Sequence, residues 1–72
     1  MSPDRLVYMA NQIGKFFTSQ RTDKAVAAIA DHMRKFWDPR MRRDILAHCD
    51  DPDLHLDPLV REAVERLREP VA

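Results

Sequence analysis

The 72-residue chain has a single cysteine, Cys49, and a single glycine, Gly14. One cysteine cannot form a disulfide within the chain, and it cannot supply the several thiolates of a structural zinc site or an iron–sulfur cluster. A phosphate-binding loop is also excluded, because such a loop needs at least two glycines. The sequence therefore lacks the features of a nucleotide-binding enzyme and of a cysteine-ligated metal domain.

Neither charge sign is in excess, since twelve basic side chains balance twelve acidic ones. A neutral chain has no broad positive field to attract nucleic acid or an anionic membrane. No apolar run approaches the roughly 18 residues of a membrane span, and the first residues lack the pattern of a signal peptide. We therefore expect a cytoplasmic protein without nucleic-acid or membrane partners.

The length predicts one small domain, residues 1–72. A domain of this size buries only about 60% of the surface that its unfolded chain exposes. Natural domains this small often gain stability from disulfides, metals or oligomerisation. Since an internal disulfide is impossible, we expect either close helix packing or a partner protein to stabilise the fold.

Proline favours the first position of a helix directly after a capping Ser or Asp. This pair occurs at Ser2-Pro3, Asp38-Pro39 and Asp57-Pro58. A fourth helix start has Thr22 and Asp23 as candidate caps, and no segment alternates with the period of a strand. We predict an all-α fold, a small bundle of about four short helices at 3–18, 23–37, 39–49 and 58–69.

The first predicted helix has a wide apolar face, which covers about half of its circumference. A helix at the surface of a bundle needs an apolar arc of only about 100° or a little more. One flank of this face carries Val7, Ala10, Gly14 and Phe17, and the small Gly14 suits the close approach of another backbone. The helix therefore either lies centrally among the other three or presents this flank to another protein.

The stretch KFWDPRMRR, residues 35–43, joins the second and third predicted helices without room for a loop. The two helices must therefore diverge at a sharp corner, whose geometry Asp38 and Pro39 fix. Adjacent residues on a helix point about 100° apart, so Phe36 and Trp37 cannot both face the centre of a narrow core. We expect one of them at the edge of the core.

Positive charge is concentrated after this corner, on Arg40, Arg42 and Arg43. The helix dipole is positive at an N-terminus and favours acidic side chains there. The acids that could compensate within the chain are Asp31, Asp38 and Asp44. The alternative is a partner protein whose acidic groups pair with the arginines, with Trp37 as the apolar anchor beside them.

Possible metal donors gather between the last two predicted helices, at His48, Cys49, Asp51, Asp53 and His55. None of the familiar zinc spacings is present, which favours a solvated polar loop over a metal site. No nucleophile has a plausible base and orienting group nearby in sequence. We predict no catalytic, cofactor-binding or metal-binding residue in this chain.

Three stretches together resemble the delta subunit of bacterial NAD-dependent, molybdenum-containing formate dehydrogenase. They are MANQIGKFF (9–17), AAIADHMRKFWDPRMRRDIL (27–46) and LDPLVREAVERL (56–67), and ADHMRKFWDPRMR is the most specific block. In that family, formate oxidation belongs to a large subunit with molybdopterin guanine dinucleotide and iron–sulfur clusters, and other subunits bind FMN and NAD. The resemblance implies that the delta chain carries none of these cofactors.

The resemblance further implies a non-catalytic accessory subunit that supports assembly, stability or cofactor-loaded maturation of the catalytic subunit. We predict that the contact with the catalytic subunit involves Val7, Ala10, Gly14, Phe17, Phe36, Trp37, Arg40, Arg42 and Arg43. Trp37→Ala is then expected to release the subunit without loss of helicity. The alternatives are a small helical nucleic-acid-binding domain, because a sharp corner beside arginines resembles a helix-turn-helix, and a self-associating bundle.

Overall fold

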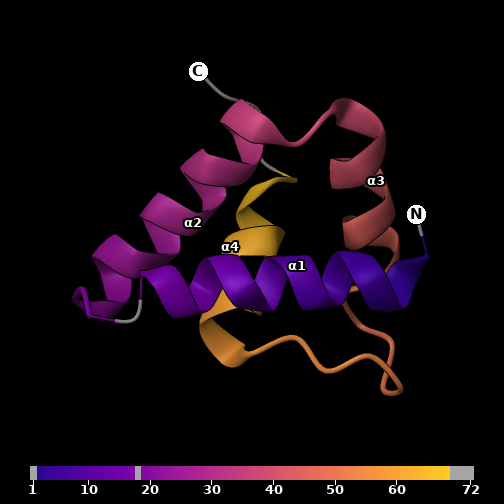
Figure 1. The fold of residues 1–72 in the computed structure, drawn as a ribbon, viewed down its shortest axis with the longest axis horizontal. Helices are drawn as coiled ribbons and strands as arrows, with labels where there is room; N and C mark the ends of the chain where they lie inside the picture. The colour runs from indigo at the N-terminus through magenta and orange to yellow at the C-terminus, as the bar shows by residue number, and fades with distance from the viewer. Residues whose placement is uncertain (1, 18, 69–72) are drawn as a thin grey trace.

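The computed structural model describes residues 2–17 and 19–68, which form four helices (Figure 1). The helices are α1 (Pro3–Phe16), α2 (Thr22–Phe36), α3 (Pro39–His48) and α4 (Pro58–Arg66). The described residues contain no strand, and the predicted all-α fold is confirmed. Three helices start at their predicted residues and α2 starts one residue earlier, whereas residues 18 and 69, predicted as helix ends, lie outside the described part.

Two of the predicted side-chain caps are present. Ser2 Oγ accepts a hydrogen bond from the Arg5 amide at 3.3 Å, and Asp38 Oδ1 accepts one from the Met41 amide at 2.8 Å. Asp57 precedes Pro58 as predicted, but its carboxylate does not cap α4. The Ser-Pro and Asp-Pro pairs therefore mark three helix starts correctly. The side chain of the N-cap residue makes a capping hydrogen bond at two of them, α1 and α3.

The predicted caps of α2, Thr22 and Asp23, are wrong by one or two positions. The N-cap is Arg21, which has extended backbone angles (φ −60°, ψ 150°) and makes no capping side-chain hydrogen bond. Its carbonyl accepts from the Ala25 amide at 2.7 Å, so the helix starts at Thr22. Asp23 lies in the first turn, where its negative charge is favoured by the helix dipole.

Helix α1 runs across one face of the molecule, and α4 lies behind it between α2 and α3 (Figure 1). Helix α1 contacts all three other helices, and α2 packs most extensively on α4. Leu6, Val7, Ala10 and Gly14 of the apolar face of α1 are buried within the chain, as the first of our two interpretations predicted, whereas Phe16 near the end of the helix is exposed. None of the helices that the structure describes has the length and hydrophobicity needed to cross a bilayer.

All four helices contribute to one hydrophobic core. Its largest fully buried side chains are Leu6, Val26, Ile29, Met33, Ile45, Val60 and Val64. The predicted close approach at Gly14 is also present, although the neighbour is a side chain and not a backbone. A Cβ at Gly14 would overlap Val60 Cγ2, so glycine permits the contact between α1 and α4.

Candidate interaction surface

The two aromatic residues at the corner between α2 and α3 have opposite environments. Trp37 is only 6% exposed and belongs to the core, whereas Phe36 is 72% exposed. The backbone leaves the helix at Trp37 (φ −89°, ψ 136°), and its amide donates to the Met33 carbonyl at 2.9 Å. The predicted division between core and edge is correct, but Trp37 cannot anchor a partner because it is buried within its own chain.

Three further residues of the predicted surface are also buried. Val7, Ala10 and Gly14 lie in contact with the core because α1 packs on three helices at once. The expectation that they face a partner protein is therefore corrected. Phe17, the fourth residue of that flank, is only half-buried and remains accessible.

Four rings form a row that links the C-terminal ends of α1 and α2, and we call it the aromatic ridge. Phe16 and Phe17 contact edge to face with centroids 5.6 Å apart, and Phe17 lies 6.3 Å from the His32 ring. His32 stacks obliquely on Phe36 at 4.7 Å. Such spacings are typical of favourable aromatic pairs. The ridge therefore holds its rings in a defined arrangement at the surface.

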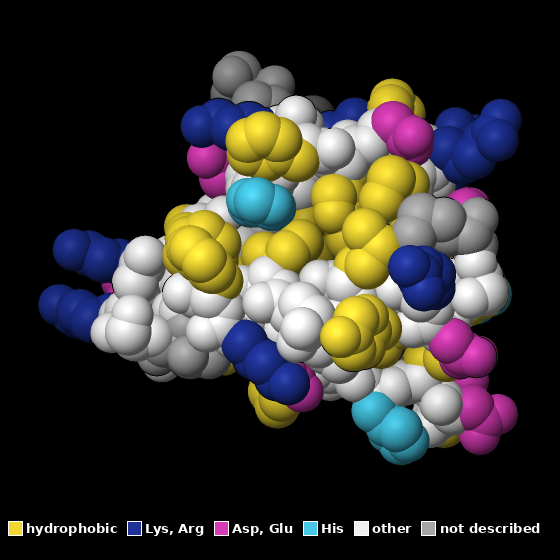
Figure 2. All heavy atoms as spheres, in the orientation of Figure 1, with side chains coloured by type: hydrophobic (Ala, Val, Ile, Leu, Met, Phe, Trp, Pro, Cys, Tyr) yellow, Lys and Arg dark blue, Asp and Glu magenta, His cyan; other side chains and the backbone are white. Residues whose placement is uncertain are grey.

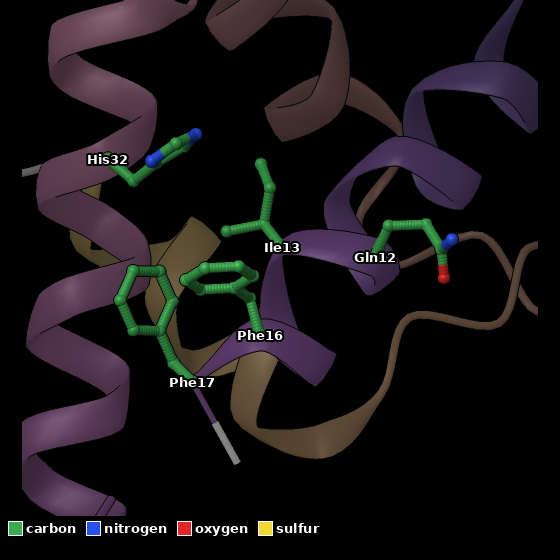
Figure 3. A pocket seen from close by; sticks show the side chains of 5 residues that line it. All are labelled: Gln12, Ile13, Phe16, Phe17 and His32. Atoms are coloured by element: carbon green, nitrogen blue, oxygen red, sulfur yellow. The ribbon is translucent and has the colours of Figure 1, made fainter. Parts of the chain in front are cut away.

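A groove of about 290 Å³ runs along the ridge between α1 and α2, lined by Gln12, Ile13, Phe16, Phe17 and His32. The apolar side chains and His32 gather around one space, while Gln12 extends away from it (Figure 3). Phe16 is 83% exposed although the core is complete without it. Figure 2 shows hydrophobic side chains continuing in a band across this face. A contiguous exposed apolar surface of this kind is characteristic of an interaction site.

The three arginines of α3 have different roles. Arg42 Nη1 donates to the Arg34 carbonyl at 3.3 Å, and Arg34 Nη2 donates to the Arg66 carbonyl at 2.7 Å. These two side chains thereby satisfy carbonyls near the C-terminal ends of α2 and α4, which lack helical partners. Arg40 and Arg43 are exposed and form no ion pair with any residue in the described ranges.

The acids expected to compensate the arginines have other partners or none. Asp31 pairs with Lys35 at 3.0 Å, and Asp38 caps α3. Within the part of the chain that the structure describes, Asp44 forms no ion pair. The positive charge at the start of α3 is therefore not neutralised by these three acids.

Comparison with known families matches residues 5–64 to the NADH-dependent formate dehydrogenase delta subunit, FdsD. The chain belongs to the FdsD family. The match covers α2 and α3 completely and most of α1 and α4, and it includes the aromatic ridge and the corner. Comparison with curated proteins and with solved structures gave no match.

A cluster of polar and charged side chains surrounds Cys49 in this FdsD-family chain. The thiol donates to Glu65 Oε1 at 3.2 Å, Arg68 Nε donates to Glu65 Oε2 at 2.8 Å, and Arg61 pairs with Asp50. Burial raises the pKa of the Cys49 thiol, and the Glu65 carboxylate raises it further. The Arg68 guanidinium lowers the pKa of Glu65, and the hydrogen bond from Cys49 lowers it further.

Donor atoms of Cys49, Asp50 and Glu65 lie within 4.8 Å of one another, which is close enough for a shared ion. Each carboxylate already pairs with a guanidinium, Asp50 with Arg61 and Glu65 with Arg68, so a metal ion here would have to displace both ion pairs. Of the five donors considered from the sequence, only Cys49 belongs to this group. The cluster is an ion-paired seam between α4 and the end of α3.

The loop after α3 is held in place by Asn11 of α1. Asn11 Nδ2 donates to the His55 carbonyl at 2.9 Å, and its Oδ1 accepts from the Asp57 amide at 2.9 Å. Asn11 thus satisfies a backbone donor at the start of α4. The sequence gives no signal for this role, because the residues it links lie more than 40 positions apart.

Proposed function

We propose that this chain is a non-catalytic accessory subunit of NADH-dependent formate dehydrogenase that binds the catalytic subunit. Its role is to support assembly, stability or cofactor-loaded maturation of that subunit through protein–protein contacts. Membership of the FdsD family supports association with a formate dehydrogenase. The observation that carries the contact itself is the aromatic ridge, an exposed apolar surface on a chain whose core is already complete.

The physical basis is the hydrophobic effect. Phe16 and Phe36 expose 83% and 72% of their surface. Removing such rings from water is favourable by roughly 25 cal/mol per Å² of apolar area, which offsets part of the entropy lost on association. Aromatic side chains are also enriched at the centres of protein interfaces. We assign molybdopterin guanine dinucleotide, the iron–sulfur clusters, FMN and NAD to other subunits and place the complex in the cytoplasm.

A pull-down of the tagged chain from its native host tests this function. The eluate is analysed by mass spectrometry and assayed for formate-dependent NAD reduction. Recovery of an active, cofactor-loaded catalytic subunit supports a permanent subunit, whereas recovery of a cofactor-free catalytic subunit supports a maturation factor. Recovery of no formate dehydrogenase subunit would contradict the proposal.

The contacts of the arginine side chains argue against the alternative function, nucleic-acid binding. Arg42 binds a carbonyl of its own chain and the exposed Lys35 pairs with Asp31, which leaves Arg40 and Arg43 as exposed basic residues at the corner without an ion pair in the described ranges. Phosphate binding needs a clustered basic face, because affinity rises with the number of phosphates neutralised. We therefore retain the accessory-subunit function alone.

A further inference from the structure

We propose that the aromatic ridge together with Arg40 and Arg43 forms one docking site for an acidic amphipathic segment of the catalytic subunit. This inference rests on the proposed function and deepens it. The apolar side chains of the partner segment enter the groove between α1 and α2. Its carboxylates pair with the two arginines at the start of α3.

The groove fits apolar protein side chains better than a small molecule. Its volume of about 290 Å³ lies at the lower limit of small-molecule pockets, which also have several converging polar groups. Here only Gln12 and His32 are polar, and Gln12 points away from the space (Figure 3). Three of its five lining residues are Ile13, Phe16 and Phe17, which favour an apolar partner.

The charge of the occupant follows from the position of the arginines. No acidic residue lies in the first turn of α3. Asp38 caps the helix terminus itself, but among the described residues neither Arg40 nor Arg43 forms an ion pair. Arg40 and Arg43 are three positions apart and therefore neighbours on the helix surface. Carboxylates of a partner would neutralise these two exposed charges and bind each guanidinium group through two hydrogen bonds.

The corner joins the apolar and charged halves of the site. Phe36 is the last residue of α2, and Arg40 follows four positions later in α3. Between them, Trp37 is buried and Asp38 is fixed by its 2.8 Å capping bond. Figure 2 shows dark blue side chains, with a magenta one next to them, at the edge of the hydrophobic band on this face. One partner segment can therefore contact both halves.

A second copy of this chain is a poorer occupant. In a two-fold symmetric dimer, the same patch contacts itself. Such a dimer would bring the arginines of two copies together, and like charges across an interface are unfavourable. The charge of the site therefore favours an acidic partner over self-association.

The test measures binding of the full-length chain to the purified catalytic subunit by biolayer interferometry over a range of salt concentrations. Phe16→Ser and Phe36→Ser remove the ridge, and Arg40→Glu combined with Arg43→Glu reverses the charge. The matched controls are Tyr8→Ser, also exposed on α1, and Arg21→Glu combined with Lys24→Glu at the opposite end of α2. Circular dichroism checks that every variant keeps its helicity.

We expect each ridge variant to weaken binding by roughly 30-fold, as loss of an interface hot spot does. Charge reversal should weaken binding at least about tenfold at low salt and remove its salt dependence. Arg40→Lys combined with Arg43→Lys should restore most of the salt dependence. The control variants should bind like the wild-type chain.

Several results would contradict the proposed docking site. If the ridge variants bind like the wild-type chain, the docking surface is wrong while the proposed function stands. If charge reversal leaves affinity and salt dependence unchanged, the partner segment is not acidic. Sedimentation that shows a dimer abolished by Phe36→Ser would assign the ridge to a second copy. If the wild-type chain binds no catalytic subunit, both this inference and the proposed function fail.

Discussion

Neighbouring residues in this chain can have opposite roles, as Phe36 and Trp37 show. The helix geometry makes this division predictable, because adjacent side chains point about 100° apart. It does not say which of the two is buried. That depends on the side from which α4 and α1 approach α2, and only the packing of the whole chain fixes it.

Truncation of these two aromatic residues should therefore have unequal effects on stability. Trp37→Ala should lower the free energy of unfolding by about 3–5 kcal/mol, because it leaves a large cavity in the core. Phe36→Ala should change it by less than about 0.5 kcal/mol, as expected for an exposed side chain. Urea titrations followed by circular dichroism give both values. Equal losses would contradict the assigned core.

The Cys49 thiol should resist modification in the folded chain. Its pKa is raised by burial, so the folded-state pKa exceeds the unfolded value near 9.0. The resulting stability is complete below about pH 9 and is lost as the pH rises through the folded pKa. We expect Ellman's reagent to react at least about tenfold more slowly with native than with urea-unfolded protein at pH 8. Cys49→Ser should flatten the alkaline loss of stability.

At the scale of the helices, local sequence signals predicted where most helices start, but the sequence did not predict the contacts between distant segments. The Ser-Pro and Asp-Pro pairs located α1, α3 and α4, because capping depends on residues close in sequence. The bonds from Arg34 to the Arg66 carbonyl and from Asn11 to the loop join distant segments. No local pattern encodes these contacts or the way the helices pack. For the same reason, Val7, Ala10, Gly14 and Trp37 were predicted as surface residues but belong to the core.

The contact between α1 and α4 should be sensitive to one methyl group. Gly14→Ala favours helix formation, but its Cβ would overlap Val60 Cγ2, so we expect a net loss of about 1–3 kcal/mol. Val60→Ala in the same chain should recover part of that loss by removing the clash. A double-mutant cycle measured by thermal unfolding tests this coupling. Additive effects would show that the two helices are not in tight contact.

The loop between α3 and α4 should depend on Asn11. Asn11→Ala removes both hydrogen bonds to the loop, and we expect a loss of about 1–2 kcal/mol with faster hydrogen exchange at the Asp57 amide. Gln12→Ala is the matched control, because the Gln12 side chain, next to Asn11 in sequence, donates to the Tyr8 hydroxyl at 3.4 Å within α1 and makes no hydrogen bond to the described part of the loop. Similar exchange rates in the two variants would argue against this role.

The molecule as a whole depends on its last helix. Helix α4 places Val60, Ala63 and Val64 between α1 and α2, with at most 1% of each side chain exposed. A chain ending at residue 57 should therefore lose cooperative unfolding and much of its helicity, since so small a domain has little stability in reserve. A synthetic peptide of residues 58–72 should restore both in circular dichroism. A truncated chain that still unfolds cooperatively would contradict this.

The two-residue corner also affects how the chain can bind. Because Trp37 is buried and Asp38 is hydrogen-bonded, the orientation of Phe36 and of the start of α3 is set in the free chain. A surface that is already ordered loses little conformational entropy on association. Recognition of a partner protein at this corner would then need no refolding of the corner, and any conformational adjustment there would occur in the partner.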